Sequence, residues 1–324
     1  MESTYHNIQQ WYDALKAFLI DKGFATERPE EEWLEHGELM FVDGQAGRIA
    51  NLDESALPLD NTTNSKGGRP AGGYYDARIA AGATNSAHKS SFCVTLVAGC
   101  FTEEAFPLHF QLPSDAREEN QGFGAEFIED MLETHATYLF RERKPFSCTY
   151  GVNEKGGMDK QQFGEYLFKN FVPLVETDCA DIPGKRVLLL VDGGPGRTNA
   201  TMLAALRTRG IYLFPSGPPS TTHILQIMDM LFGEFKRVYS SNIETLYEYR
   251  LSHPTSSTIT TKNDIGVLVF GSQHSRKRNE DPSFPLLQNA AEAAFNGSRI
   301  HHCWSNKLGV FPMFTRAALK NKNT

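Results

Sequence analysis

VLLLVDGG, Val187 to Gly194, is the most informative segment of the sequence, and it follows the turn sequence PGKR. Five consecutive apolar residues bounded by turn signals are typical of a strand that is buried on both faces. Asp192 ends this strand, and glycines follow it. An aspartate at the carboxyl end of a buried parallel strand lies where α/β proteins bind ligands and metals. The stretch therefore predicts an α/β sheet with Asp192 at its functional edge.

The sequence after this strand continues the α/β pattern. Asn199 to Arg209 is expected to form a helix, and Ile211 to Phe214 a second short buried strand. After the turn-rich segment Pro215 to His223, residues Ile224 to Leu251 predict a long helix that carries Asp229 in its first turns. The order is strand, helix, strand and helix, which is typical of a layered α/β domain.

The sequence before the strand predicts a meander of three strands. Arg48 to Ser55 is expected to be the first strand, with Asp53 near its end. Ser90 to Cys100 and Ala105 to Leu112 are expected to form a hairpin beside it. Between them, NTTNSKGGRPAGG (61–73) reads as a loop rich in Gly, Asn and Ser, whose Lys66 and Arg69 could touch a phosphate backbone. The overall expectation is a mixed sheet flanked by helices.

Periodic apolar residues predict the remaining elements. Helices are expected at Tyr5 to Lys22, Phe123 to Arg143, Asp159 to Val175 and Gln288 to Phe295, a strand at Gly266 to Phe270, and a basic cluster at Arg276 to Arg278. We divide the chain into a helical N-terminal segment (1–40), a central α/β core (41–250) and a C-terminal helical or irregular extension (251–324).

Composition and short motifs exclude several classes of function. The longest apolar runs are the size of strands and too short to span a membrane. VDGGPGRTN lacks both the P-loop pattern and the dinucleotide pattern, so phosphate binding by a glycine loop is not expected. The five cysteines are scattered without a C-x-x-C pair. The net charge of −7 argues against strong non-specific DNA binding by the surface of this chain alone.

Three aspartates are candidates for one metal site. Asp53 and Asp192 follow strands that would be neighbours, and Asp229 opens a helix that would pack over the same edge. Carboxylates converging in this way suit Mg²⁺ or Mn²⁺, and two such ions support phosphoryl transfer. Each acid also has a simpler explanation, because Asp53 could be a turn residue and Asp229 a helix-opening acid favoured by the macrodipole. Haloacid-dehalogenase-like and nucleotide-binding domains also end a strand in aspartate.

Several blocks of the sequence resemble one family in the same order. NLDES (51–55), EKGGMDKQQF (154–163), VLLLVDGG (187–194), LFPSGPPSTTHILQIMDMLFGEFK (213–236) and FPMFTRAAL (311–319) resemble motifs of the DDE-type superfamily endonucleases of the pogo, jerky and centromere-protein-B branch of transposases. The resemblance covers most of the chain. Its most specific part is the block that ends in Lys236, in which threonines, glutamine, aspartate and lysine stand at the family's distances.

This resemblance implies a ribonuclease H-like fold and metal-dependent cleavage and strand transfer of DNA. Asp53, Asp192 and Asp229 would be the catalytic metal ligands for Mg²⁺ or Mn²⁺. The resemblance also implies three supporting residues, which are Glu54, Gln226 and Lys236. The partner would be DNA with no membrane, the place of action the nucleus, and the assembly a homodimer.

The chain also departs from the family pattern. Arg197 stands where relatives often have a histidine, and Ile227 where they often have a proline. Only about 40 residues precede the core, so the usual upstream helix-turn-helix domains are not expected. A domesticated nucleic-acid-binding protein without catalysis is the alternative. A metal-dependent phosphatase would need a second acid two residues after Asp192, where the chain has Gly194.

Overall fold

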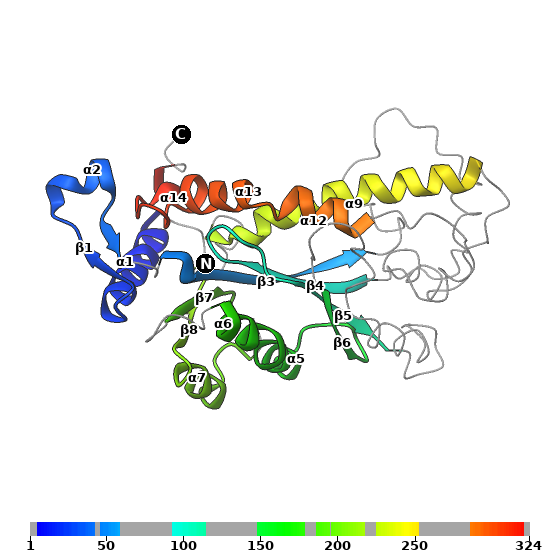
Figure 1. Cartoon of the computed structure of the whole chain (residues 1–324), viewed down its shortest axis with the longest axis horizontal. Coiled ribbons are helices and arrows are strands. Elements are labelled where there is room, and N and C mark those ends of the chain that lie inside the picture. The colour runs from blue at the N-terminus through cyan, green and yellow to red at the C-terminus, as the bar shows by residue number, and fades with distance from the viewer. Residues whose placement is uncertain are drawn as a thin grey trace.

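The structure is a computed structural model of the 324-residue chain (Figure 1). It describes residues 5–42, 46–58, 93–114, 148–178, 186–194, 196–217, 225–252 and 286–320. The predicted helix Phe123 to Arg143, the loop 61–73, the strand Gly266 to Phe270 and the basic cluster Arg276 to Arg278 lie outside these residues.

A six-stranded mixed sheet forms the centre of the fold. Its strand order is β6-β5-β4-β3-β7-β8, in which β3, β4 and β5 are antiparallel and β3, β7 and β8 are parallel, while β6 pairs parallel to β5. The strands are β3 (Ile49–Pro58), β4 (Cys93–Cys100), β5 (Leu108–Pro113), β6 (Cys148–Asn153), β7 (Val187–Val191) and β8 (Ile211–Pro215). A three-stranded meander whose first strand also pairs with parallel strand β7, next to which parallel strand β8 lies, is the predicted ribonuclease H-like arrangement, which is therefore confirmed.

Strand β7 is buried on both faces because two separate hydrophobic cores cover the sheet. Leu188 and Leu190 belong to one core, and Val187, Leu189 and Val191 belong to the other. Since side chains alternate along a strand, a run of five apolar residues is needed to fill both cores. The apolar run from Val187 to Val191 thus lies between the two helical layers.

Helices cover both faces of the sheet (Figure 1). On one side, α9 (Ile227–Ser252) and α12 (Leu286–Ala294) pack on the sheet, followed by α13 (Gly297–His302), a π-helical turn (Cys303–Leu308) and α14 (Ala317–Lys320). The other side holds α5 (Lys160–Tyr166), a π-helical turn (Leu167–Phe171), α6 (Val172–Asp178) and α7 (Ala200–Arg207).

The N-terminal part packs at one end of the α9 side. Helix α1 (Tyr5–Asp21) buries Trp11, Tyr12 and Leu15 in the same core as α9. A small second sheet and short helices follow, comprising β1 (Ala25–Glu27), a 3-10 turn (Glu30–Glu32), α2 (Trp33–His36), β2 (Leu39–Phe41) and a 3-10 turn (Ala46–Arg48). The division of the chain at residues 40 and 250 stays a prediction.

Most predicted elements among the described residues are present, with shifted ends. The first strand was expected over Arg48 to Ser55, but β3 continues to Pro58 because β4 pairs with it from Asn51 to Pro58. Strand β6 was not expected from the sequence. The helix predicted from Asp159 to Val175 contains a π-helical turn and ends at Asp178. Among the described helices, none is long and apolar enough to cross a membrane.

Candidate metal centre

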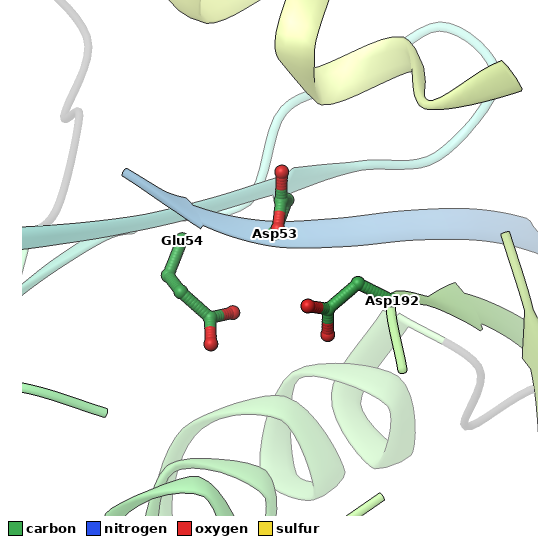
Figure 2. Close-up of side chains that lie close together, drawn as sticks. All are labelled: Asp53, Glu54 and Asp192. Carbon is green, nitrogen blue, oxygen red and sulfur yellow. The ribbon is translucent and has the colours of Figure 1, made fainter. Parts of the chain in front are cut away.

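Three acidic side chains meet where β7 ends beside β3. Asp53 and Glu54 are successive residues of β3, and Asp192 follows the last residue of β7. One carboxylate oxygen from each residue lies within 4.8 Å of the others. Figure 2 shows the carboxylates of Glu54 and Asp192 approaching each other on one side of β3, with Asp53 on the strand above them. Two of the three predicted ligands, and one predicted supporting residue, are therefore together.

The short pairing of β3 with β7 explains why acidic residues lie together at this edge of the sheet. β3 pairs with β7 only over Ile49 to Asn51, so its next residues extend past the carboxyl end of β7. Alternation along β3 places Asp53 on the side of α9 and Glu54 on the side of α5. Asp192, which leaves the end of β7, is within reach of both. The short pairing of β3 with β7 thus places Glu54 in the cluster beside Asp53.

The Asp53 carboxyl is buried beside other negative charges. Its residue is 8% exposed. Burial, followed by the charges of Glu54, Asp229 and Asp192, raises the pKa of Asp53 to about 8. Desolvation and like charges both disfavour the ionised form of a carboxyl group. A carboxylate in this environment is stabilised by any cation that binds there.

Asp229 lies next to the cluster and is not one of its three members. It occupies the first turn of α9 and is exposed. Its charge nevertheless contributes to the raised pKa of Asp53, which places the two carboxyls within electrostatic range of each other. The structure therefore brings the third predicted ligand to the same edge of the sheet, on the α9 side.

Arg197 lies against the cluster on the α5 side. Its Nε donates to Asp192 Oδ1 at 3.0 Å, and its Nη2 donates to Glu54 Oε1. The guanidinium packs over the ring of Phe163, 3.8 Å from the ring centroid, and the side chain is 4% exposed. Burial raises the pKa of Glu54, and the Arg197 charge opposes this. The sequence identified Arg197 only as a departure from the family pattern.

Glycines in the turn after β7 allow the Arg197 side chain to approach Asp192. A Cβ atom on Gly194 would lie 2.9 Å from both Arg197 Cζ and Asp192 Oδ1. Gly196 has a φ of +88°, which side chains rarely adopt. The Gly194 amide also donates to Asp192 Oδ1 at 3.0 Å. The glycines of DGGPGR thus let the chain turn so that Arg197 contacts Asp192. This pattern of glycines could have indicated the contact from the sequence.

The other two predicted supporting residues belong to the α9 region. Gln226 directly precedes α9 and is 1% exposed, and neither amide atom has a hydrogen-bond partner among the described residues. Lys236 lies further along α9 and is half-buried. Neither is a member of the three-carboxylate cluster. Their supporting roles stay predictions.

The donor set of the cluster fits a hard divalent cation. Mg²⁺ and Mn²⁺ prefer carboxylate oxygens, and Mg²⁺ sites in enzymes of phosphate chemistry commonly use only one or two protein carboxylates. Asp53, Glu54 and Asp192 offer oxygens close together, and burial together with the neighbouring negative charges raises the pKa of Asp53. Asp53 and Asp192, with Asp229 from α9, would hold the ion, while Arg197 engages Glu54 and one oxygen, Oδ1, of Asp192.

Replacing Arg197 with alanine is expected to lower the free energy of unfolding by about 3 kcal/mol in metal-free buffer, because Glu54 keeps its burial and loses its partner. Mn²⁺ should then raise the melting temperature more in this variant than in the parent. Thermal and chemical denaturation with and without Mn²⁺ measure both effects.

Arg209 provides the matched control for this variant. It also contacts a carboxylate and a phenylalanine ring, with Glu176 at 3.5 Å and the Phe168 centroid at 5.8 Å, but its side chain is 44% exposed. Arg209→Ala should cost less than about 1 kcal/mol. Equal losses in the two variants would contradict a special role for Arg197 at the cluster.

Comparison with known families agrees with this geometry. The family model described as DDE superfamily endonuclease matches residues 132–304, just over half of the chain. The match contains Asp192 and Asp229, whereas Asp53 lies before it. No curated protein matches the chain by sequence.

Solved transposase structures are similar at low sequence identity. The Mos1 transposase paired-end complex with left transposon end is 10% identical with a TM-score of 0.40, and the match covers 97% of this chain and 65% of that chain. The Mos1 mariner paired end complex with Mn is 12% identical with a TM-score of 0.37, covering 95% and 64%. The catalytic domain of Mos1 mariner transposase is 9% identical with a TM-score of 0.36, covering 95% and 96%.

The chain thus spans less than two thirds of the length of the transposase chains in the two paired-end complexes. The family model matches more than half of the chain, so the family assignment rests on that match and does not need the solved structures. The chain belongs to the DDE superfamily endonucleases.

Proposed function

We propose that this chain carries the catalytic core of a transposase of the pogo, jerky and centromere-protein-B branch, which cleaves DNA phosphodiester bonds and transfers strands with Mg²⁺ or Mn²⁺. The observation that carries the proposal is the cluster of Asp53, Glu54 and Asp192, with Asp229 beside it. The sequence blocks NLDES and LFPSGPPSTTHILQIMDMLFGEFK support the branch. DNA as partner, a homodimer and action in the nucleus complete the proposal.

The residues of the chain have separate tasks in this mechanism. Asp53 on β3, Asp192 after β7 and Asp229 on α9 present carboxylates from three elements to one edge of the sheet. When bound, divalent ions activate the attacking oxygen and neutralise charge on the leaving oxygen. Arg197 and the Gly194 amide fix the orientation of the Asp192 carboxylate through its Oδ1 atom. Phe163 covers the guanidinium and keeps it in place.

One observation favours a second function, that of a nucleic-acid-binding protein without catalysis. The Arg197 guanidinium already neutralises charge at Asp192 and Glu54, which lowers the demand of the cluster for a metal ion. A protein of this kind would keep the fold and bind DNA while leaving the phosphodiester bond intact.

Nicking of supercoiled plasmid DNA tests both functions. The purified chain should convert the plasmid to the nicked form in Mn²⁺, and a chelator should stop the conversion. The activity should follow the chain through size-exclusion chromatography, which separates it from contaminating nucleases. A gel shift at low salt without any nicking would support the binding protein instead, and absence of both activities would contradict both functions.

A further inference from the structure

Asn51 is a buried polar residue at the point where the elements of the candidate centre meet. It is 0% exposed and lies two residues before Asp53 on β3. Residues two apart on a strand project from the same face, so Asn51 and Asp53 both face α9. In the sheet, Asn51 pairs with Cys100 of β4 on one side and Leu190 of β7 on the other.

The side-chain amide of Asn51 bonds to three different segments. Its Nδ2 donates to the Leu190 carbonyl at 3.1 Å and to Ser216 Oγ at 3.2 Å. Its Oδ1 accepts from the Met228 backbone N–H at 3.1 Å. Both amide hydrogens and the amide oxygen are therefore used. These bonds connect β3 to β7, to the segment after β8 and to the first turn of α9.

Two of these bonding partners, and Asn51 itself, are each close in sequence to one of the three candidate ligands. Leu190 is two residues before Asp192, Met228 is directly before Asp229, and Asn51 is two residues before Asp53. The Met228 N–H belongs to the first turn of a helix, where backbone donors have no partner within the helix. Asn51 thus caps α9 from a different element, and asparagine is a favoured residue for capping.

We propose that Asn51 is a positioning residue that holds the first turn of α9, and with it Asp229, in register with Asp53 and Asp192. That this positioning serves metal binding rests on the proposed function. Only a side chain with both donors and an acceptor can make all three bonds. An aspartate would place a carboxylate against the Leu190 carbonyl, and a leucine, which is branched in the same way but larger and apolar, would leave the Leu190 and Met228 backbone groups buried without partners.

The test compares Asn51→Leu, Ser216→Ala and the parent chain in two measurements. In metal-free protein, hydrogen exchange at the Met228 amide should be faster in Asn51→Leu by about tenfold or more, because its acceptor is gone. Mn²⁺ binding, followed by electron paramagnetic resonance, should weaken about 10- to 100-fold, as is typical when a group that orients metal ligands is lost. Ser216→Ala removes one of the three bonds and should show a smaller loss in the same direction.

Asn296 supplies a matched control, because it is also a helix-capping asparagine. It caps α13 by accepting from the Arg299 N–H at 2.9 Å, and it is exposed. Asn296→Ala should leave Met228 exchange and Mn²⁺ affinity unchanged. Parental exchange at Met228 and parental Mn²⁺ affinity in every folded variant of Asn51 and Ser216 would overturn the inference. If the parent itself binds no Mn²⁺, the proposed function fails, whereas Met228 exchange still decides whether Asn51 holds α9.

Discussion

Replacing Asp192 with asparagine is expected to reduce Mn²⁺-dependent nicking on the order of a thousandfold or more, because it removes the charge of the only candidate ligand that follows β7. Asparagine keeps the size of the side chain. Its carbonyl oxygen can still accept from Gly194 N and Arg197 Nε, as Asp192 Oδ1 does. The fold should therefore survive, and the initial rate of plasmid nicking measures the loss.

The control for this variant is an acid of the same type at the surface. Asp21 ends α1, has a side chain 68% exposed and pairs with its neighbour Lys22. Asp21→Asn should nick at the parental rate. If Asp192→Asn nicks within about tenfold of the parent, then Asp192 does not hold an essential ion, since removing even one preorganised charge-stabilising group typically costs more than this.

The sequence was a good guide to the sheet where the apolar pattern was complete. The run from Val187 to Val191 has one explanation, because two cores must be filled from one strand. The meander and the long helix after His223 were predicted for similar reasons. Strand β6 was missed because only Cys148 of its six residues is fully buried, so it has no alternating pattern to detect.

The candidate site was harder to predict, because it depends on pairing and not on sequence order. The resemblance named Asp53, Asp192 and Asp229, but it did not show that Glu54 would be a member of the close cluster. That follows from the short pairing of β3 with β7, which leaves both acids beyond the end of β7. The contact of Arg197 with Glu54 was not predicted because the two residues are 143 apart in the sequence. Asn51 was not predicted as a site residue because its nearest side-chain partner in the sequence, Leu190, is 139 residues away.

Asp53→Asn is expected to stabilise the metal-free protein at pH 8 while abolishing Mn²⁺-dependent nicking. The pKa of Asp53 is about 8 in the folded chain and about 3.9 in an unfolded one. Between these values the folded state binds a proton that the unfolded state releases, so the free energy of unfolding of the parent falls as pH rises from about 4 to about 8. Asparagine cannot ionise, so the free energy of unfolding of the variant does not fall in this way.

The gain should be on the order of 5 kcal/mol at pH 8, at about 1.4 kcal/mol per pKa unit, and should vanish below about pH 4. Chemical denaturation across this pH range measures it, and Asp21→Asn should follow the parent at every pH. Mn²⁺ at about 100 times its dissociation constant should stabilise the parent by about 2.7 kcal/mol and leave Asp53→Asn unchanged. Asp53→Asn is therefore expected to be more stable than the parent without metal at pH 8, and to lose the stabilisation by Mn²⁺ that the parent shows. A variant that merely folds poorly cannot produce both results. If Asp53→Asn is no more stable than the parent at pH 8 without metal, then Asp53 ionises there without strain, and the electrostatic argument for a cation at this edge of the sheet is wrong.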